Sequence, residues 1–309
     1  MHVPVLLHKT VDLLVANPAG TYVDGTLGRG GHAAEILKRL SPAGRLIGID
    51  RDEDAIEEAK EILKPFGERA VGLHGNFADM KQLCEQIGVA EVDGILLDLG
   101  VSSPQLDVAE RGFSFAKDGP LDMRMDRTQK KSAADFVNDA DEEELANLIY
   151  RFGEDRDSRR IARAIVEARQ RRRIERTTEL AEIIEKAKGG RRGATHPATQ
   201  SFQALRMAVN SELESVERGI ESGLSMLRDG GRMTVITFHS LEDRLVKEIF
   251  KRHTVRRESL QQGGEQLIYN KPPVRPLTKK PLTADENELK TNPRARSAKL
   301  RAVEKEKAA

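Results

Sequence analysis

The sequence contains few of the residues that stabilise secreted proteins or membrane spans. Its 309 residues include a single cysteine, Cys84, no tryptophan and only 4% aromatic residues. One cysteine excludes an intrachain disulfide, which is typical of a protein in a reducing compartment. No apolar run approaches the roughly 20 residues of a membrane span, and the first residues lack the basic and apolar regions of a secretory signal. We therefore expect a cytoplasmic protein with no membrane partner and a core of Leu, Ile, Val and Ala.

An excess of one charge is also absent, because 51 Lys and Arg oppose 50 Asp and Glu. The basic residues are nevertheless concentrated in the segments 151–176, 186–192 and 271–307. Local basic surface is compatible with phosphate contacts, but it is equally typical of a solvated helix face. Charge alone therefore leaves nucleic-acid binding open.

The first hundred residues alternate short apolar runs with amphipathic segments. The apolar runs predict strands at Thr21–Asp24, Arg45–Asp50, Ala70–His74 and Gly94–Asp98. The segments between them predict helices at His32–Leu40, Asp54–Leu63 and Met80–Ile87. Apolar strands that alternate with helices are typical of a parallel sheet covered on both faces. The sequence therefore predicts a doubly wound α/β domain.

A helical segment then interrupts the alternation. Residues 107–127 predict an ordered loop, and helical periodicity alone follows from Ser132 to Lys188. A long helix is expected from Thr199 to Leu227, ended by Gly230-Gly231. We therefore predict a discontinuous α/β domain, residues 1–108 and 206–309, split by an all-helical insertion at 109–205 that recognises the substrate.

The sheet pattern resumes after the insertion. Met233–Phe238 predicts a strand, and Ser240 with Asp243 predicts a capping box that begins a helix over Leu241–Phe250. The segment 261–281 predicts irregular structure, and 298–303 predicts a last strand.

A glycine-rich turn joins the first predicted strand to the first predicted helix. It covers residues 24–32 and contains Gly28, Gly30 and Gly31. Glycine permits positive φ and close approach of a ligand to the backbone, and ligands of open α/β sheets bind at the carboxyl ends of strands. Asp50 ends the second strand, where a carboxylate can accept both hydroxyls of a ribose.

The same turn satisfies a loose dinucleotide fingerprint, so a nucleotide remains an alternative ligand. Three features favour S-adenosyl-L-methionine. Asp24 ends the first strand, Phe77 follows the third, where a ring can pack against adenine, and Asp98 ends the fourth. Carboxylates along one edge suit a cationic ligand and repel a diphosphate. We therefore predict S-adenosyl-L-methionine as the cofactor, and no metal.

Residues 98–105, Asp-Leu-Gly-Val-Ser-Ser-Pro-Gln, follow the fourth strand. Their position is similar to the Asp/Asn/Ser-Pro-Pro-aromatic loop of amino-methyltransferases. The exocyclic amine of cytosine is a weak nucleophile because its lone pair is delocalised into the ring. Acceptors directed at its protons would free the lone pair, and in-line positioning would supply much of the rate. The candidate catalytic residues are Asp98, Ser102, Ser103 and Gln105.

The motif departs from that loop because it has one proline and no adjacent aromatic residue. A ring that stacks on the base must then come from elsewhere, and Phe113 and Phe115 are the nearest in the sequence. These rings are equally suited to anchoring their own loop by burial. Phe115 is our candidate substrate-binding residue.

With these motifs the chain resembles the bacterial 16S ribosomal RNA (cytosine-N4)-methyltransferase family of the MraW type. The matching stretches span nearly the whole chain and include 24–32, 94–105, 118–126, 196–206 and 238–244. The resemblance implies a Rossmann-like class I methyltransferase domain that methylates a decoding-region cytidine of 16S rRNA in the small ribosomal subunit. It implies cofactor contacts at Gly30, Gly31, His32, Asp50, Phe77, Asp98 and Gln105.

Four further residues are predicted to contact the substrate: Arg159, Arg160, Arg206 and His239. The two arginines of the basic segment would contact rRNA phosphates. Arg206 and His239 also suit structural roles, as a hydrogen bond at a domain junction and as a helix cap. The residues alone do not choose RNA over DNA or protein. A non-catalytic RNA-binding assembly factor with the same fold remains the alternative, and a homodimer is left open.

Overall fold

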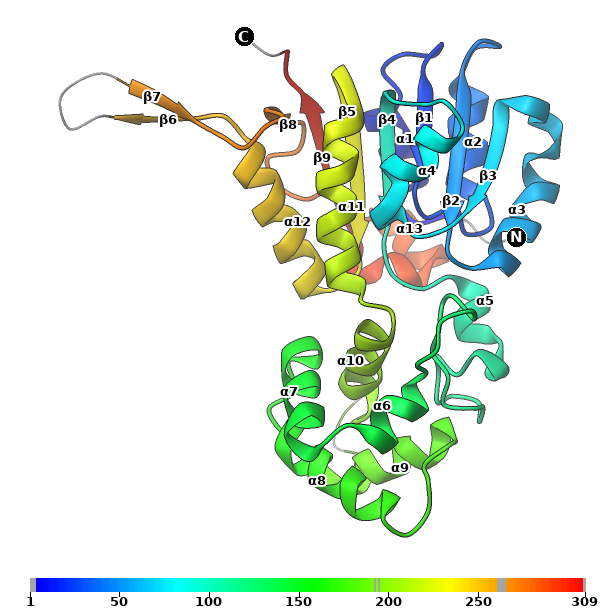
Figure 1. The fold of residues 1–309 in the computed structure, drawn as a ribbon, viewed down its shortest axis with the longest axis vertical. Coiled ribbons are helices and arrows are strands. Elements are labelled where there is room, and N and C mark those ends of the chain that lie inside the picture. Colours follow the sequence, from blue (N-terminus) through cyan, green and yellow to red (C-terminus); the bar gives the residue numbers. More distant parts are fainter. Residues whose placement is uncertain (1–3, 192, 194, 260–264, 308–309) are drawn as a thin grey trace. The chain divides into compact units, whose positions relative to one another are not determined.

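The computed structural model describes residues 4–191, 193, 195–259 and 265–307. The chain divides into two compact units, shown in Figure 1. Met1–Gly100 and Leu213–Ala309 form the sheet unit, and Val101–Glu212 form the helical unit. Among the described helices, none is long and apolar enough to cross a membrane. The boundaries expected at 108 and 206, and the role of the insertion in substrate recognition, stay predictions.

A seven-stranded sheet forms the centre of the sheet unit, in the order β3-β2-β1-β4-β5-β9-β8. Its strands are β1 (Thr21–Asp24), β2 (Arg45–Asp50), β3 (Ala70–His74), β4 (Val92–Asp98), β5 (Leu227–Thr237), β8 (Val274–Pro276) and β9 (Lys299–Lys305). The first five strands pair in parallel, and β9 runs antiparallel to both β5 and β8. The predicted mostly parallel α/β sheet is confirmed.

Alternate strand residues pack into two separate cores, because successive side chains of a strand point to opposite faces. The helices of this unit are α1 (Leu7–Leu14), α2 (Gly31–Arg39), α3 (Glu53–Leu63), α4 (Met80–Gln86), α11 (Glu212–Met226), α12 (Ser240–His253) and α13 (Glu286–Thr291). Ile95 and Leu97 of β4 pack on one face with α4, α11 and α12. Leu96 packs on the other face with α1, α2 and α3. Helices on both faces make the sheet doubly wound.

The strand order places a switch point between β1 and β4. β1 pairs with β2 on one side and with β4 on the other, and Asp24 stands opposite Gly48 and Leu96. The chain leaves these strands in opposite directions, which opens a ligand site at their carboxyl ends. The sheet thereby places the ends of β1, β2 and β4 along one edge, and each of them ends in an aspartate.

The helical unit has its own apolar core, to which residues such as Leu145, Ile161 and Ile184 contribute. Its helices are α5 (Ser103–Asp107), α6 (Ala133–Asp139), α7 (Glu142–Gly153), α8 (Ser158–Arg169), α9 (Thr177–Ala187) and α10 (Thr199–Val209). Between 132 and 188 the described backbone forms helices and no named strand, which confirms the predicted helical segment.

The long helix predicted from Thr199 to Leu227 is two helices. α10 ends at Val209 and α11 begins at Glu212, and Ser211 between them has a positive φ of 47°. A left-handed residue ends a helix, but the apolar spacing continues on the far side of it, so periodicity could not reveal the break. Gly230-Gly231 does not end a helix either, because both glycines lie in β5.

Two further expectations after the insertion were wrong. The N-cap of α12 is His239, whose capping-box partner is Glu242, and Asp243 instead pairs with Arg301 at 2.7 Å. The segment 261–281 is not irregular throughout, because β7 (Glu265–Ile268) pairs with β6 (Arg256–Ser259), and β8 joins the main sheet. Residues 261–264 lie outside the described part of the chain.

Candidate cofactor and substrate site

The glycine turn between β1 and α2 adopts a backbone that requires glycine. Gly28 and Gly30 have φ of 49° and 77°, in the left-handed region where a side chain is strained. Gly31 begins α2, and a Cβ at this position would collide with Pro4. The N–H of Gly28 donates to Asp50 Oδ2 at 2.8 Å, so the end of β2 holds the turn in place.

Three aspartates, Asp24, Asp50 and Asp98, form an acidic rim at the carboxyl ends of β1, β2 and β4. Thr26 links the first and the last of them. Its N–H donates to Asp24 Oδ1 at 3.1 Å, and its Oγ1 accepts the N–H of Asp98 at 2.6 Å. Among the described residues, the buried atoms Asp24 Oδ2 and Asp98 Oδ1 have no hydrogen-bond donor. Buried carboxylate oxygens without donors are unfavourable in isolation, and they fit a ligand that carries a cation.

The environment of the acidic rim favours protonation of its carboxyl groups. Burial raises the pKa of Asp24 to about 7, although hydrogen bonds from Thr26 oppose this shift. Burial, and then the charges of Asp24 and Glu242, raise the pKa of Asp98 well above its usual value. Burial also raises the pKa of Asp50, against the hydrogen bonds from the N–H groups of Asp52 and Gly28. A positively charged ligand would reverse these shifts.

The raised pKa of Asp24 makes the stability of the free protein depend on pH. The folded pKa of about 7 exceeds the unfolded value of about 3.9. The folded protein therefore binds more protons between these two values, and its stability falls as the pH rises through that window. Between about pH 5 and about pH 8, the free energy of unfolding of the wild type should decrease. In Asp24→Asn, which has no carboxyl group to ionise at this position, the decrease should be smaller by about 2 kcal/mol. Urea unfolding at both pH values measures the difference, and parallel profiles would contradict the assignment.

His32 lies on the first turn of α2 and is buried. Its Nε2 is 3.1 Å from the carbonyl oxygen of Val5, and its Nδ1 is 3.5 Å from Asp98 Oδ2. The ring therefore connects the N-terminal segment with the acidic rim. The anchor at Val5 could not be predicted from the sequence, because no motif marks that carbonyl group.

Phe77 begins a short 3-10 helix, η2 (Phe77–Asp79), after β3. Asn76 caps this helix by accepting the N–H of Ala78 at 3.0 Å. The ring of Phe77 is half-buried, and a Cβ on Gly219 of α11 would collide with it. Phe77 is thus held on the same side of the sheet as α11, and its role against adenine stays a prediction.

In the helical unit, Ser102 and Gln105 form a capping box at the start of α5. Gln105 Oε1 accepts the N–H of Ser102 at 3.0 Å, and Ser102 Oγ accepts the N–H of Gln105 at 3.5 Å. Gln105 is buried, with 5% of its surface exposed. The side chain of Ser103 lies outside the described part of the structure. The catalytic roles of these residues stay predictions.

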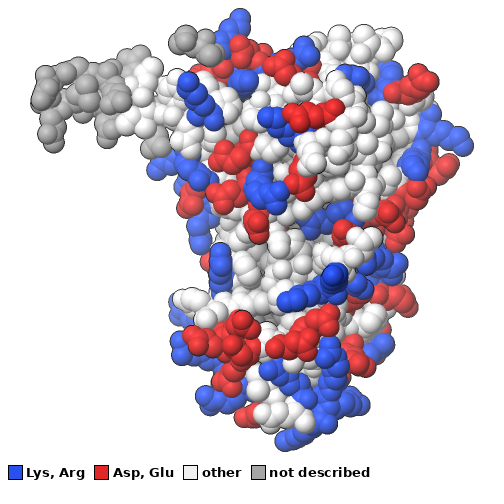
Figure 2. Space-filling model, in the orientation of Figure 1, with Lys and Arg blue, Asp and Glu red and all other residues white. Residues whose placement is uncertain are grey.

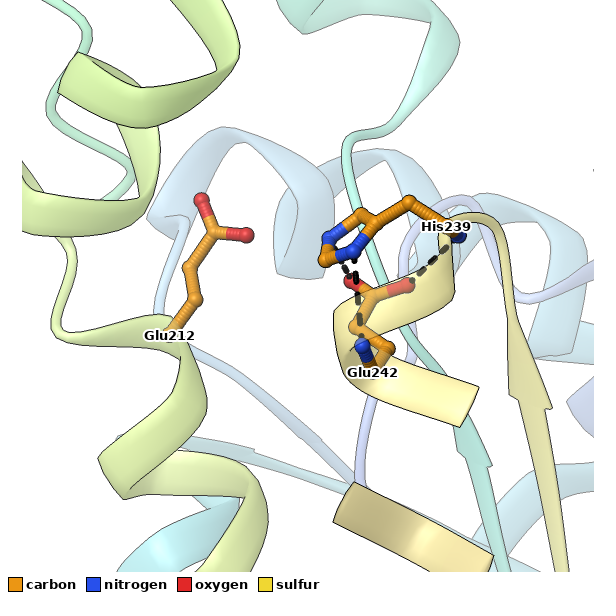
Figure 3. A group of neighbouring side chains, drawn as sticks. All are labelled: Glu212, His239 and Glu242. Carbon is orange, nitrogen blue, oxygen red and sulfur yellow. Dashed lines mark hydrogen bonds and ion pairs between the residues drawn. The ribbon is translucent and has the colours of Figure 1, made fainter. Parts of the chain in front are cut away.

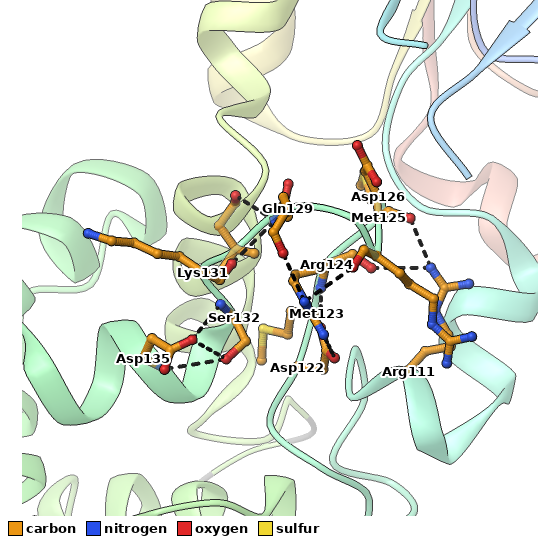
Figure 4. A network of polar contacts seen from close by, with 12 residues as sticks. Arg111, Asp122, Met123, Arg124, Met125, Asp126, Gln129, Lys131, Ser132 and Asp135 are labelled. Atoms are coloured by element: carbon orange, nitrogen blue, oxygen red, sulfur yellow. Dashed lines mark hydrogen bonds and ion pairs between the residues drawn. The ribbon is translucent and has the colours of Figure 1, made fainter. Parts of the chain in front are cut away.

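The loop 118–126 of the helical unit is held by polar contacts, shown in Figure 4. Arg111 donates to the carbonyl groups of Arg124 and Met125 at 3.2 and 3.1 Å. The guanidinium of Arg124 contacts both carboxylate oxygens of Asp122 at 2.7 Å. These contacts fix the backbone of the loop from within the helical unit.

Asn210, the C-cap of α10, is a further anchor of this loop. Its Oδ1 accepts the N–H of Met125, and its Nδ2 donates to the carbonyl of Met123, both at 2.8 Å. The only sequence signal was its polar character on an otherwise apolar helix.

Phe115 and Arg206 both have partners within the helical unit. The ring of Phe115 lies 4.7 Å from that of Phe202 and 4.5 Å from that of His196. Arg206 makes a two-point contact with Glu212, with both distances at 2.8 Å. These contacts give both residues a structural role, and their contacts with the substrate stay predictions.

His239, in the sheet unit, is held by Glu242, as Figure 3 shows. Its Nδ1 accepts the N–H of Glu242 at 3.3 Å, and its Nε2 lies 2.9 Å from Glu242 Oε1. Glu242 Oε2 in turn accepts the N–H of Phe238 at 2.8 Å. His239 is therefore a helix cap, and a contact with the substrate stays a prediction.

The basic segment of the helical unit is exposed. Figure 2 shows basic side chains, with acidic ones between them, over the part of this unit where α8 and α9 lie. Arg160 pairs with Asp157 at 3.2 Å. Arg159 and Arg171 are exposed, and neither has an ion pair with any described residue. They keep their full charge for an external anion.

The strand order defines a Rossmann-like α/β protein, and the acidic rim at its switch point is a candidate ligand site. The model of the MraW methylase family matches residues 1–306. A ribosomal RNA small subunit methyltransferase H from Symbiobacterium thermophilum is 50% identical over 98% of this chain and 96% of that relative. Its counterpart from Geobacter sulfurreducens is 52% identical over 98% of both. The crystal structure of a putative rRNA-methylase from Clostridium thermocellum shares 12% identity, with a TM-score of 0.44 and full coverage of both chains. The chain belongs to the MraW methylase family, which confirms the resemblance drawn from its motifs.

Proposed function

We propose that the protein uses S-adenosyl-L-methionine to methylate 16S rRNA of the small ribosomal subunit, at N4 of a cytidine in the decoding region. One observation carries the cofactor assignment: the acidic rim contains two buried carboxylate oxygens that accept no hydrogen bond from any described residue, beside a glycine turn. The relatives, which are named ribosomal RNA small subunit methyltransferase H, support the substrate class. The choice of an amine as the target is supported by the similarity of residues 98–105 to amino-methyltransferase loops. The choice of a decoding-region cytidine rests on the resemblance of nearly the whole chain to the family.

The sheet unit would bind the cofactor. S-adenosyl-L-methionine supplies a methyl group on a sulfonium centre and carries an ammonium group at its other end. Asp50 would accept the ribose hydroxyls, Phe77 would pack against the adenine, and Asp24 and Asp98 would balance the positive charge. Gly28, Gly30, Gly31 and His32 would form the wall of the site with backbone atoms and one buried ring.

The motif 98–105 would act on the amine of the base. Asp98, Ser102, Ser103 and Gln105 supply acceptors that can orient its two protons and free the lone pair. Direct in-line transfer is the expected mechanism, because Cys84 is buried and burial raises the pKa of its thiol to about 11. A thiol with that pKa provides almost no thiolate at neutral pH. The methylated amine can lose its proton to water, so a strong base is not required.

The helical unit would recognise the RNA. Arg159 and Arg160 would contact phosphates, and Phe115 and Arg206 of the same unit would contact the substrate. His239 of the sheet unit is a further candidate for a substrate contact. Phosphate contacts position a protein on RNA and make its affinity depend on salt.

Removal of an unpaired arginine should therefore change the salt dependence of binding. Arg159→Gln and Arg171→Gln should each reduce the slope of log affinity against log salt by about 0.7 to 0.9. Binding to small subunits at several salt concentrations measures the slope. Arg228→Gln is the control, because Arg228 is also exposed, has only a 3.9 Å contact with Glu91, and belongs to the sheet unit. Unchanged slopes in both helical-unit variants would exclude these residues from the interface.

Incubation with labelled S-adenosyl-L-methionine and small subunits tests the activity. Label should appear in 16S rRNA, and mass spectrometry of the digested RNA should find N4-methylcytidine at a single position. A non-catalytic assembly factor would bind subunits without transferring label, and methylation at another atom would refute the N4 assignment alone.

A further inference from the structure

His32 and Asp98 form a buried pair whose protonation state follows from its neighbours. The carbonyl oxygen of Val5 can only accept a hydrogen bond, so the Nε2 of His32, 3.1 Å away, must carry a proton. A neutral ring in this tautomer presents the lone pair of Nδ1 to Asp98 Oδ2, 3.5 Å away. Two lone pairs at this distance repel each other, and a single proton on either atom turns the repulsion into attraction.

The surroundings of Asp98 further favour a proton on this pair. Asp24 from β1 and Glu242 from α12 place negative charge near Asp98, and Asp50 from β2 places negative charge near Asp24. His32 from α2 is the basic side chain that the described structure places on Asp98. The side chains of His32 and Asp98 keep only 6% and 25% of their surfaces exposed, so water screens these charges poorly.

We propose that His32 and Asp98 hold one proton between them in the free protein, and that this proton leaves for the solvent when the ammonium group of the cofactor binds. His32 is then a positioning residue that acts through Asp98. The proposal rests on the cofactor assignment made under the proposed function. The charge balances, because one positive charge enters the rim as one proton leaves it.

The exchange has a consequence for affinity. Where the free pair holds its proton, binding is opposed by the free energy of removing it, so affinity rises with pH by up to about tenfold per pH unit. The rise ends where the free pair has already lost the proton. A ligand with no ammonium group should show neither the proton release nor the rise in affinity.

Titration calorimetry with S-adenosylhomocysteine tests the exchange, because this probe keeps the ammonium but has neither the sulfonium charge nor the reactive methyl. Asp24, with its pKa of about 7, has lost most of its proton by about pH 8. Measurements near that pH in buffers with different ionisation enthalpies therefore count the protons that the pair releases. The wild type should release about one proton per ligand. His32→Gln, which retains a donor for Val5, and Asp98→Asn should each release less than half of that. Methylthioadenosine, which has no amino-acid portion, should release none.

Asp50→Asn is the matched control, because it changes a different carboxylate of the acidic rim. It should weaken affinity while the number of released protons stays the same. Binding without proton release in the wild type would overturn the inference and leave the proposed function intact. Release that persists in both His32→Gln and Asp98→Asn would overturn the assignment to this pair. No binding of S-adenosylhomocysteine at any pH would refute the cofactor assignment itself, and the inference would fall with it.

Discussion

Asp50→Ala should weaken the binding of S-adenosylhomocysteine by about 100-fold or more. Asp50 Oδ2 accepts the N–H of Gly28 at 2.8 Å, and Oδ1 accepts the N–H of Asp52 at 2.9 Å, so the carboxylate orders the glycine turn and the start of α3. In the proposed complex it also accepts the ribose hydroxyls. Each hydrogen bond to a charged group contributes about 1.5 to 3 kcal/mol, so the loss of two such bonds explains the expected effect. Titration calorimetry measures it directly.

Asp93 provides the control for this prediction. It lies near the amino end of β4, where it accepts the N–H of Thr21 at 2.9 Å and a hydrogen bond from Asn17 at 2.8 Å. Asp93→Ala should therefore lower stability without changing ligand affinity, because the ligand site is at the opposite ends of the strands. Equal losses of affinity in the two variants would show that the effect at Asp50 is structural. Full affinity in Asp50→Ala would remove the aspartate from the site.

The sheet and its acidic rim could be predicted because their signals are local. β1, β2 and β3 have the bounds expected from their apolar runs. The three aspartates follow such runs directly, and the parallel arrangement then brings them to one edge. Local composition also marked the glycine turn, where Gly28 and Gly30 do have positive φ.

The contacts that give the site its chemistry join residues far apart in the sequence. Thr26 Oγ1 accepts the N–H of Asp98, and His32 is anchored on Val5. Neither partner belongs to a recognisable pattern, because a backbone group is present at every residue. For a similar reason, the sequence could not show that His239, and not Ser240, caps α12. Both residues have a suitable acceptor, and only the backbone shows where the helix begins.

The break between α10 and α11 illustrates a different limit. Apolar residues recur at helical spacing on both sides of Ser211, because each helix buries one face in its own unit. Apolar periodicity shows which residues are buried, and buried residues continue at the same spacing on both sides of the break. The left-handed φ of Ser211 depends on a single residue that has no glycine or proline signal.

Asn210, beside that break, carries the second large prediction. Asn210→Ala should lower the free energy of unfolding of the helical unit by about 3 kcal/mol, because it removes hydrogen bonds to Met125, Met123 and Arg206. The N–H of Met125 would then be buried without its partner, which is the more costly half of the loss. Met123 has a positive φ of 61°, a conformation that persists only where surrounding contacts enforce it.

Hydrogen exchange at the amides of Met123, Arg124 and Met125 measures the effect where it arises, without assuming that both units unfold together. Gln203→Ala, in the helix that Asn210 caps, is the control. Within the described structure the amide of Gln203 contacts only a weak acceptor, Met207 Sδ at 3.8 Å. Asn210→Asp should be intermediate, since it keeps the acceptor for Met125 and loses the donor for Met123.

If the loop 118–126 helps to position the RNA, Asn210→Ala should weaken binding to small subunits and leave S-adenosylhomocysteine affinity unchanged. Unaltered exchange in the loop would mean that Arg111 and Arg124 suffice to hold it.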